Sequence, residues 1–257
     1  YHYLAINLLS KAHYGDLAAL ISIFGLLAIV QQSLGLAIVK FIASSKNQAE
    51  ANNLAKWILF WSIWIAGGTA VLVFMLAPFL TKFLNISQPL AVFLFAPVIF
   101  IAFISNSGRA LLQGFVKFTQ YSISMIIEVA VKIAITVALV YAGYELFGAV
   151  VGLLVGSIVG LSIVWFSVKD NLAGNKNPMP KIGPLIRYSL PVLVQSLAVT
   201  SMYSMDIILV KHFFRPETAG AYAALAKFGT IALFAASPIT NVMFPLVAKR
   251  HSHGEPY

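Results

Sequence analysis

Long uncharged apolar stretches alternate with short polar segments along almost the whole chain. Each stretch is long enough, at roughly 20 residues, to cross about 30 Å of hydrocarbon as an α-helix. The pattern predicts a series of transmembrane helices, preceded by the tail of an earlier one at residues 1–9. The predicted spans are residues 17–39, 57–81, 83–108, 118–144, 146–168, 188–210 and 218–248. Because the chain begins with Tyr1 rather than methionine, we interpret it as a fragment.

Prolines, glycines and polar residues divide this pattern. Pro89 predicts a helix start, and Pro97 predicts a bend in the helix that follows it. Residues 169–183 are rich in Asn, Gly and Pro and predict a polar linker. In the stretch before this linker, glycine recurs at every fourth position, which is typical of a helix surface that packs closely against a neighbour. These glycines are Gly148, Gly152, Gly156 and Gly160.

The sequence near the beginning of the chain is repeated after the linker, and the two copies align without a gap. In both copies a polar corner precedes an apolar helix, which favours two pseudo-repeated lobes. The identical pairs are Gly15 and Gly220, Ala18 and Ala223, Ala19 and Ala224, Leu20 and Leu225, and Ala43 and Ala248. We therefore expect a nearly complete first transmembrane lobe at residues 1–168, from a partial helix 1 to helix 6. A cytoplasmic linker at 169–183 and the start of a second lobe at 184–257, with helices 7 and 8, would follow.

Composition indicates an all-α integral membrane protein. Hydrophobic residues make up 60% of the chain and charged residues 10%, whereas soluble domains carry about 25% charged residues. The net charge of +9 would also suit a nucleic-acid partner, but the basic residues stand at the ends of the apolar stretches and form no solvated patch. The chain has no cysteine, which excludes disulfides and thiolate metal sites within it.

The lysines and arginines also predict an orientation. Loops alternate between the two sides of the membrane, and only four basic residues fall on the poorer side: Lys11, Lys82, Lys211 and Arg215. Because basic loops are retained in the cytoplasm, the richer side is predicted to be cytoplasmic. That side holds Lys40, Lys46, Lys56, Arg109, Lys117, Lys169, Lys176, Lys181, Arg187, Lys249 and Arg250.

Three segments resemble the polysaccharide transporters of bacteria and archaea, also called oligosaccharide flippases. Residues 8–44 resemble their first extracytoplasmic corner and second helix, and residues 109–135 resemble the connection between their fourth and fifth helices. Residues 187–228 resemble the start of their second lobe, with Asp206 near the end of the seventh helix and a Gly-x-Tyr sequence opening the eighth. The resemblance implies the fold of the multidrug/oligosaccharidyl-lipid/polysaccharide flippase superfamily, two six-helix lobes around a central cavity.

The resemblance implies a function as well. It is that of a multi-pass flippase of the cell inner membrane, not an enzyme, which exports oligosaccharide linked to polyprenyl phosphate or pyrophosphate by alternating access. We expect a monomer in the bilayer with no cofactor, and coupling to H⁺ or Na⁺ stays open. One alternative is a cation-coupled multidrug exporter of the same superfamily, which would favour acidic residues in the cavity. Another is a membrane-embedded glycan polymerase or ligase, which would need a large outer loop with catalytic residues.

Ionisable residues inside the predicted spans are the first candidates for function, because burying one at a helix centre costs about 2.5–3.5 kcal/mol. Glu128 and Lys132 are one turn apart, in the order that favours a local ion pair. Either the two residues neutralise each other against the bundle, or they line the cavity. In the cavity Lys132 would meet an anionic head group, or Glu128 would exchange a proton.

Two arginines stand at the predicted cytoplasmic ends of helices. Arg109 shares one helix face with Asn106 and Gln113, and Arg187 lies at the entrance of the seventh span. Each arginine is either an ordinary positive-inside anchor or a binding residue whose planar fork fits phosphate oxygens. With Lys132, we name Arg109, Arg187 and Gln113 as substrate-binding candidates.

The last two spans contain further polar residues. Tyr188, Gln195 and Asp206 recur on one face of the seventh span, and we add Gln195 to the substrate-binding candidates. Asp206 is either a coupling residue or a lobe-stabilising hydrogen-bond acceptor near the outer end. Lys227, in the eighth span, either faces the cavity or extends outward to the interface. No residue is named as a metal ligand.

Overall fold

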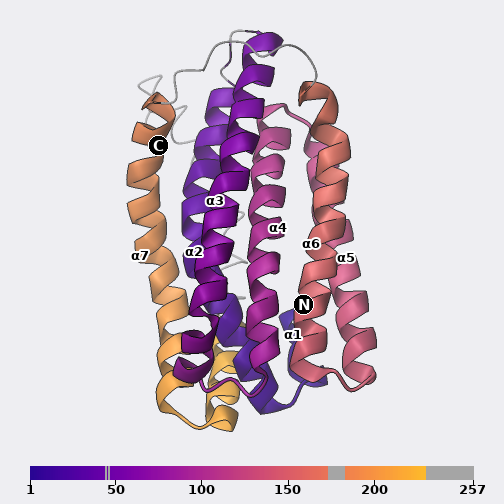
Figure 1. Cartoon of the computed structure of the whole chain (residues 1–257), viewed down its shortest axis with the longest axis vertical. Helices are drawn as coiled ribbons and strands as arrows, with labels where there is room; N and C mark the ends of the chain where they lie inside the picture. The colour runs from indigo at the N-terminus through magenta and orange to yellow at the C-terminus, as the bar shows by residue number, and fades with distance from the viewer. Residues whose placement is uncertain (44, 46, 173–182, 230–257) are drawn as a thin grey trace, which may run out of the picture.

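All regular structure in the described part of the chain is helical. The computed structural model describes residues 1–43, 45, 47–172 and 183–229, and its long helices run side by side (Figure 1). The elements are α1 (His2–Leu8), α2 (Lys11–Ala43), α3 (Gln48–Phe83), α4 (Pro89–Gly114), α5 (Phe118–Tyr141), α6 (Glu145–Val168), the 3₁₀ turn η1 (Lys169–Leu172) and α7 (Gly183–Phe213). Residues 216–229 form a further helix after α7.

The helices α2 to α6 are long and apolar enough to cross a membrane. A sixth span is made by α7 when its two parts, Ile186–Met202 and Ser204–Phe213, which meet at 43°, are taken together. The prediction of an all-α membrane protein is therefore confirmed. Most of the predicted linker, at residues 173–182, and the end of the second lobe, at residues 230–257, lie outside the described residues.

Local chemistry explains where two of the helices begin. Helix α3 starts at Gln48 rather than at residue 57, because the side chain of Asn47 accepts a hydrogen bond from the N–H of Glu50 (2.8 Å) and so caps the helix. The polar residues 48–56, predicted to be a connection, are helical turns. Helix α4 starts at Pro89 as predicted, because an N–H group in the first turn of a helix has no acceptor within the helix and proline loses no hydrogen bond there.

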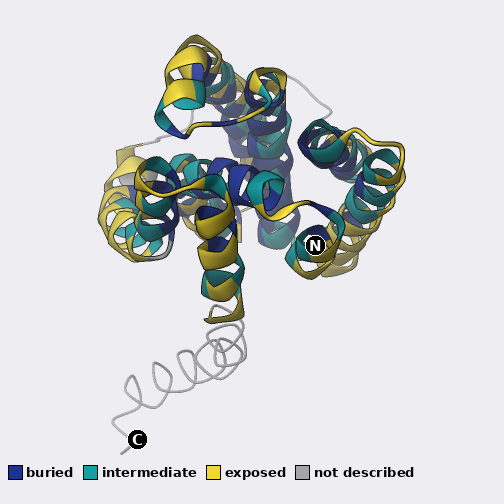
Figure 2. Cartoon of the chain, turned by 90° about the horizontal axis from the view of Figure 1, so that it is seen from below, coloured by how far each residue is buried: buried dark blue, intermediate teal, exposed yellow. Residues whose placement is uncertain are grey.

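The packing separates a buried interior from a lipid-facing surface. Helix α4 packs against α2, α3 and α6, whereas α5 packs mainly against α6. Seen along the helices, the exposed residues lie mostly on the outside of the bundle (Figure 2). Many of them on α3 and α5 are large and apolar, among them Phe60, Trp64, Met75 and Ile126. Because these large apolar side chains are exposed on helices that are long and apolar enough to cross a membrane, they are suited to contact lipid.

The predicted glycine stripe of α6 is a packing surface. A Cβ atom added at Gly148 would lie 2.8 Å from the Cβ of Leu139, and one added at Gly156 would lie 2.9 Å from the Cβ of Lys132. Both neighbours belong to α5. The backbones of α5 and α6 are therefore closer together than larger residues would permit.

The two ends of the bundle differ in charge. Lys40, Lys117, Lys169 and Arg187 lie where α2, α4 and α6 end and where α7 begins, at the upper end in Figure 1. We name this the basic end, and the positive-inside rule predicts that it faces the cytoplasm. We name the opposite end, where α2 begins and α7 ends, the outer end.

Candidate functional site

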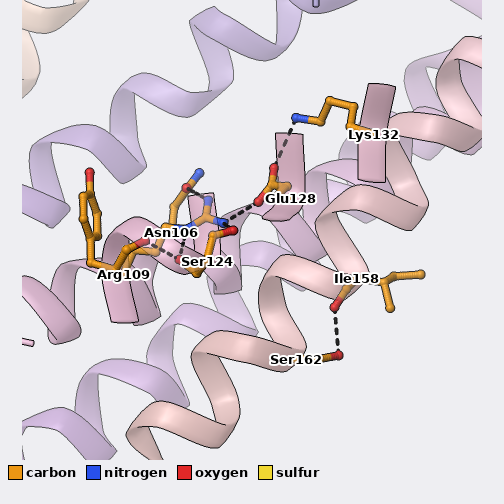
Figure 3. Close-up of polar contacts among 8 residues, drawn as sticks. Asn106, Arg109, Ser124, Glu128, Lys132, Ile158 and Ser162 are labelled. Atoms are coloured by element: carbon orange, nitrogen blue, oxygen red, sulfur yellow. Dashed lines mark hydrogen bonds and ion pairs between the residues drawn. The ribbon is translucent and has the colours of Figure 1, made fainter. Parts of the chain in front are cut away.

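Three charged side chains meet inside the first lobe, where α4 faces α5 (Figure 3). Nη2 of Arg109 lies 2.5 Å from Oε2 of Glu128. The other carboxylate oxygen of Glu128 accepts a hydrogen bond from Nζ of Lys132 (3.2 Å), one turn further along α5. The side chains of Arg109, Glu128 and Lys132 are 10%, 12% and 18% exposed. One carboxylate is thus shared by two cations in a largely buried place, and the cluster has a net positive charge.

Arg109 is held by more than its ion pair. Its Nε donates to the hydroxyl of Ser124 (3.1 Å), Nη2 also donates to the Ser124 carbonyl (3.2 Å), and Nη1 donates to the side chain of Asn106 (3.3 Å). With the bond to Glu128, these contacts use most of the donors of the guanidinium. A planar fork can reach Ser124 and Glu128 together, whereas a lysine ammonium at this position would not reproduce the arrangement.

The glycine stripe of α6 makes room for this cluster. A Cβ atom at Gly160 would lie 2.5 Å from Oε2 of Glu128 and 2.9 Å from Nη2 of Arg109. Even the side chain of alanine would therefore press on the ion pair. The stripe, predicted mainly as a packing surface, also decides where the charges can lie.

Arg109 and Asn106 stand between two cavities. The first-lobe cavity, of about 260 Å³, is lined by both residues and by Glu128 and Lys132. Its other polar lining residues are Tyr1, His2 and Ser157. The interlobe cavity, of about 620 Å³, lies between α2, α4, α5 and α7 and is lined by Arg109 and Asn106 as well. The cluster therefore borders both spaces.

Amide side chains dominate the polar lining of the interlobe cavity. They come from Gln31 and Gln32 on α2 and from Asn106 and Gln113 on α4. A carboxamide both donates and accepts hydrogen bonds, which is the complement of a sugar hydroxyl. The spacing of Asn106, Arg109 and Gln113 predicts their common face, but our sequence reasoning missed Gln31 and Gln32. The available signal was two adjacent glutamines in the middle of an apolar stretch.

Asp206 joins the two described helices of the second lobe. Its Oδ2 accepts a hydrogen bond from the hydroxyl of Tyr222 (2.9 Å), and its Oδ1 accepts one from the N–H of Ile207 (2.7 Å). Lys227, on the helix at residues 216–229, is half-buried. The geometry at Asp206 is that of a contact between α7 and the helix at residues 216–229.

The remaining candidates lie away from the cluster. Arg187 and Gln195 are exposed on α7 and line neither of the two cavities, so their binding role stays a prediction. Nζ of Lys40 lies 4.0 Å from the ring centre of Tyr188, a cation–π contact between the end of α2 and the start of α7. The bend in α7 falls between Gln195 and Asp206, so it interrupts the predicted polar face.

Two basic residues are more buried than the sequence pattern predicts. Arg109, assigned to the cytoplasmic side, is only 8% exposed because Glu128 of α5 compensates its charge. Lys211, assigned to an outer corner, is 1% exposed, and its Nζ lies 2.6 Å from Oδ1 of Asp16. In the sequence, the sign of this second pair was one acidic residue, Asp16, directly before a long apolar stretch.

Within the described ranges, no group of three or more His, Asp or Glu residues could hold a metal ion.

One solved structure with a similar fold is an inward-facing conformation of a multidrug resistance MATE family transporter of the MOP superfamily. The TM-score is 0.78 at 14% sequence identity, and the match covers 93% of this chain but 58% of the other. At this identity the likeness shows the fold alone, and this chain spans little more than half the length of that transporter. None of the curated proteins compared with the chain matches it.

Sequence comparison with families gives a more complete match. The model of the polysaccharide biosynthesis protein family aligns with residues 1–251, nearly the whole chain. It therefore includes both members of the Arg109–Glu128 pair and the described part of the second lobe. The chain belongs to the polysaccharide biosynthesis protein family.

Proposed function

We propose that this chain is part of a flippase that moves lipid-linked oligosaccharide to the outer face of the cell inner membrane by alternating access. The observation that carries the proposal is an amide-lined interlobe cavity that borders the Arg109–Glu128–Lys132 cluster. The family and the fold support a membrane transporter, and these side chains point to the class of substrate.

The two kinds of side chain fit the two parts of such a substrate. A lipid-linked oligosaccharide presents sugar hydroxyls next to a phosphate or pyrophosphate. The carboxamides of Gln31 and Gln113 can hydrogen-bond to hydroxyls, while Arg109 and Lys132 can bind phosphate oxygens. The interlobe cavity would take the sugars, and the cluster would take the charge.

Glu128 shares its carboxylate between the two cations, Arg109 and Lys132. An arriving phosphate would compete with this carboxylate for the two cations. Arg109 would keep its contacts with Ser124 and Asn106 throughout. In the described part of the chain, the ammonium of Lys132 donates a hydrogen bond to Glu128 alone, so Lys132 is the cation that changes partner most easily.

The charge of the cavities distinguishes this proposal from cation-coupled drug export. Glu128 is the one acidic residue in the described linings of the two cavities, and it is outnumbered there by Arg109 and Lys132. A cavity that selects cationic drugs would need an excess of acidic groups, because like charges repel the substrate. The excess of basic groups favours an anionic substrate.

The test is to delete the gene and to measure on which membrane face lipid-linked oligosaccharide accumulates. We expect accumulation on the cytoplasmic face and loss of surface glycan. The whole natural gene should restore export, and its Lys132→Gln variant should not, although the protein inserts normally. Lys169→Gln, at an exposed position of the basic end, is the matched control and should restore export. Normal outward transfer in the deleted cells would refute the proposal, and new sensitivity to cationic drugs would favour the exporter.

A further inference from the structure

A second buried charge pair lies at the outer end of the bundle. Asp16, in the first turns of α2, and Lys211, in the last turn of α7, are each 1% exposed, with 2.6 Å between Oδ1 and Nζ. The other oxygen of Asp16 accepts hydrogen bonds from the hydroxyl (2.8 Å) and the N–H (3.3 Å) of Ser87. Asp16 and Ser87 belong to the first lobe and Lys211 to the second. The pair therefore joins the two lobes.

Each charge of this pair is compensated by the other charge. Apart from each other, neither Oδ1 of Asp16 nor Nζ of Lys211 has a partner in the described part of the chain. A buried ammonium without its carboxylate is strongly unfavourable, but hydration of both charges together offsets the loss of the contact. Such a pair can thus hold a closed state and still separate when water reaches both groups.

The corner between α3 and α4 holds the same end of α7. The ring of His212 stacks on Phe83 with 4.1 Å between centres, and its Nδ1 donates to the Phe83 carbonyl (2.6 Å). Asn85 donates to the carbonyl of His212 (3.4 Å). Two consecutive residues of the second lobe, Lys211 and His212, are therefore bound by the first lobe.

The backbones of the two lobes also meet beside this pair. A Cβ atom at Gly15 would lie 3.0 Å from the backbone nitrogen of Gly220, so no side chain separates α2 from the helix at residues 216–229. In contrast, the interlobe cavity of about 620 Å³ lies on the side of Gln113 and Val39, toward the basic end. The lobes are closed at the outer end and hollowed nearer the basic end.

We propose that Asp16 and Lys211 form the outer gate of the transport cycle, which is closed in this structure. The proposal rests on the function proposed above, because outward transport requires the outer ends of the lobes to separate. Separation would hydrate Asp16 and Lys211 together and withdraw His212 from Phe83. Asp16, Lys211 and Ser87 are thus gating residues and bind no substrate.

The absence of cysteine from this chain permits a direct test. In the whole natural chain, cleared of any other cysteine, Ala28→Cys places one thiol in the interlobe cavity. A membrane-impermeant thiol reagent is then added outside intact cells. We expect slow labelling in this parent and labelling at least about tenfold faster after Lys211→Met, the change produced by a shift of about 1.4 kcal/mol in a gating equilibrium.

Two further variants and a control complete the test. Asp16→Asn with Lys211→Met removes both charges, avoids an unpaired buried ion, and should also label faster. Lys211→Arg, which keeps the charge, should label at close to the parental rate. Arg215→Met changes an exposed basic residue of the same corner and should have no effect. Parental labelling of the double variant would overturn the gate. Because labelling requires no substrate, its outcome is separate from the oligosaccharide assay, which alone decides the proposed function.

Discussion

Gly15 and Gly220, equivalent positions of the two repeats, lie against each other where α2 meets the helix at residues 216–229. A Cβ atom added to Gly15 would be 3.0 Å from the nitrogen and 3.1 Å from the Cα of Gly220. A Cβ atom added to Gly220 would overlap the carbonyl oxygen of Lys11. An identity between two distant parts of the sequence is thus also a contact between two backbones.

We expect Gly220→Ala to destabilise the protein by about 1–3 kcal/mol, because its methyl group would push on a backbone atom that cannot rotate away. Gly15→Ala should cost less, since its added Cβ would lie 3.0 Å from the nearest backbone atom and would not overlap it. Thermal unfolding of the purified protein in detergent measures both. Gly68→Ala is the control: no atom lies within 4 Å of its added Cβ, and the higher helix propensity of alanine adds up to about 1 kcal/mol. Equal melting temperatures for Gly220→Ala and the parent would contradict the contact.

Replacement of Arg109 should separate the roles of charge and shape. Arg109→Met leaves Glu128 with one cation and should destabilise the protein by about 3 kcal/mol, as expected when a largely buried pair loses one partner. Arg109→Lys keeps the charge but loses part of the contact with Ser124, so its cost should be smaller, about 1–2 kcal/mol. Denaturant unfolding measures the order of the two variants.

The matched control for these variants is Arg187→Met, which changes an exposed arginine at the same end of the bundle. It should alter stability by less than about 0.5 kcal/mol, the usual range for surface substitutions. If Arg109→Met were as stable as Arg187→Met, the buried ion pair would not be present in the folded protein.

Gly160 should be coupled to Glu128 in a double-mutant cycle. Gly160→Ala alone should destabilise the protein, because the added methyl group would overlap the space of the Glu128 carboxylate and the Arg109 guanidinium. In a Glu128→Ala background most of that space is free, so the same change should cost less. The difference, measured by denaturant unfolding, should be at least about 0.5 kcal/mol. Additive effects would show that the carboxylate lies elsewhere.

The class of fold could be predicted from the sequence, because the length of an apolar stretch and the charge of a loop depend on neighbouring residues alone. The spans, the start of α4 at Pro89 and the packing role of the α6 glycines follow from residues that are neighbours in the sequence. The proximity of Glu128 and Lys132 follows in the same way, since one turn of helix brings them together.

Contacts between helices could not be predicted from such local properties. Nothing in the local pattern states that Arg109 reaches Glu128, or that Lys211 reaches Asp16, because these pairs depend on how the helices are placed. A basic residue near a helix end is interpreted as an anchor at the membrane–water interface unless an acidic residue on another helix is known to face it. The two glutamines of the interlobe cavity were missed because a single helix does not show which of its faces borders a cavity.

Asp206 and Tyr222 provide the last prediction, which decides between two roles of the acid. If Asp206 serves to join α7 to the helix at residues 216–229, then Tyr222→Phe and Asp206→Asn remove or weaken the same hydrogen bond of 2.9 Å. Each should cost about 1 kcal/mol of stability and leave oligosaccharide export near the parental level.

A coupling role would give a different result. Export would then be lost in Asp206→Asn, which cannot carry the negative charge, and kept in Tyr222→Phe, which leaves the carboxylate in place. We expect the first outcome, because the carboxylate already accepts hydrogen bonds from Tyr222 and from the backbone of Ile207. Export assayed in cells that carry each variant, with the protein level measured in the same membranes, distinguishes the two roles.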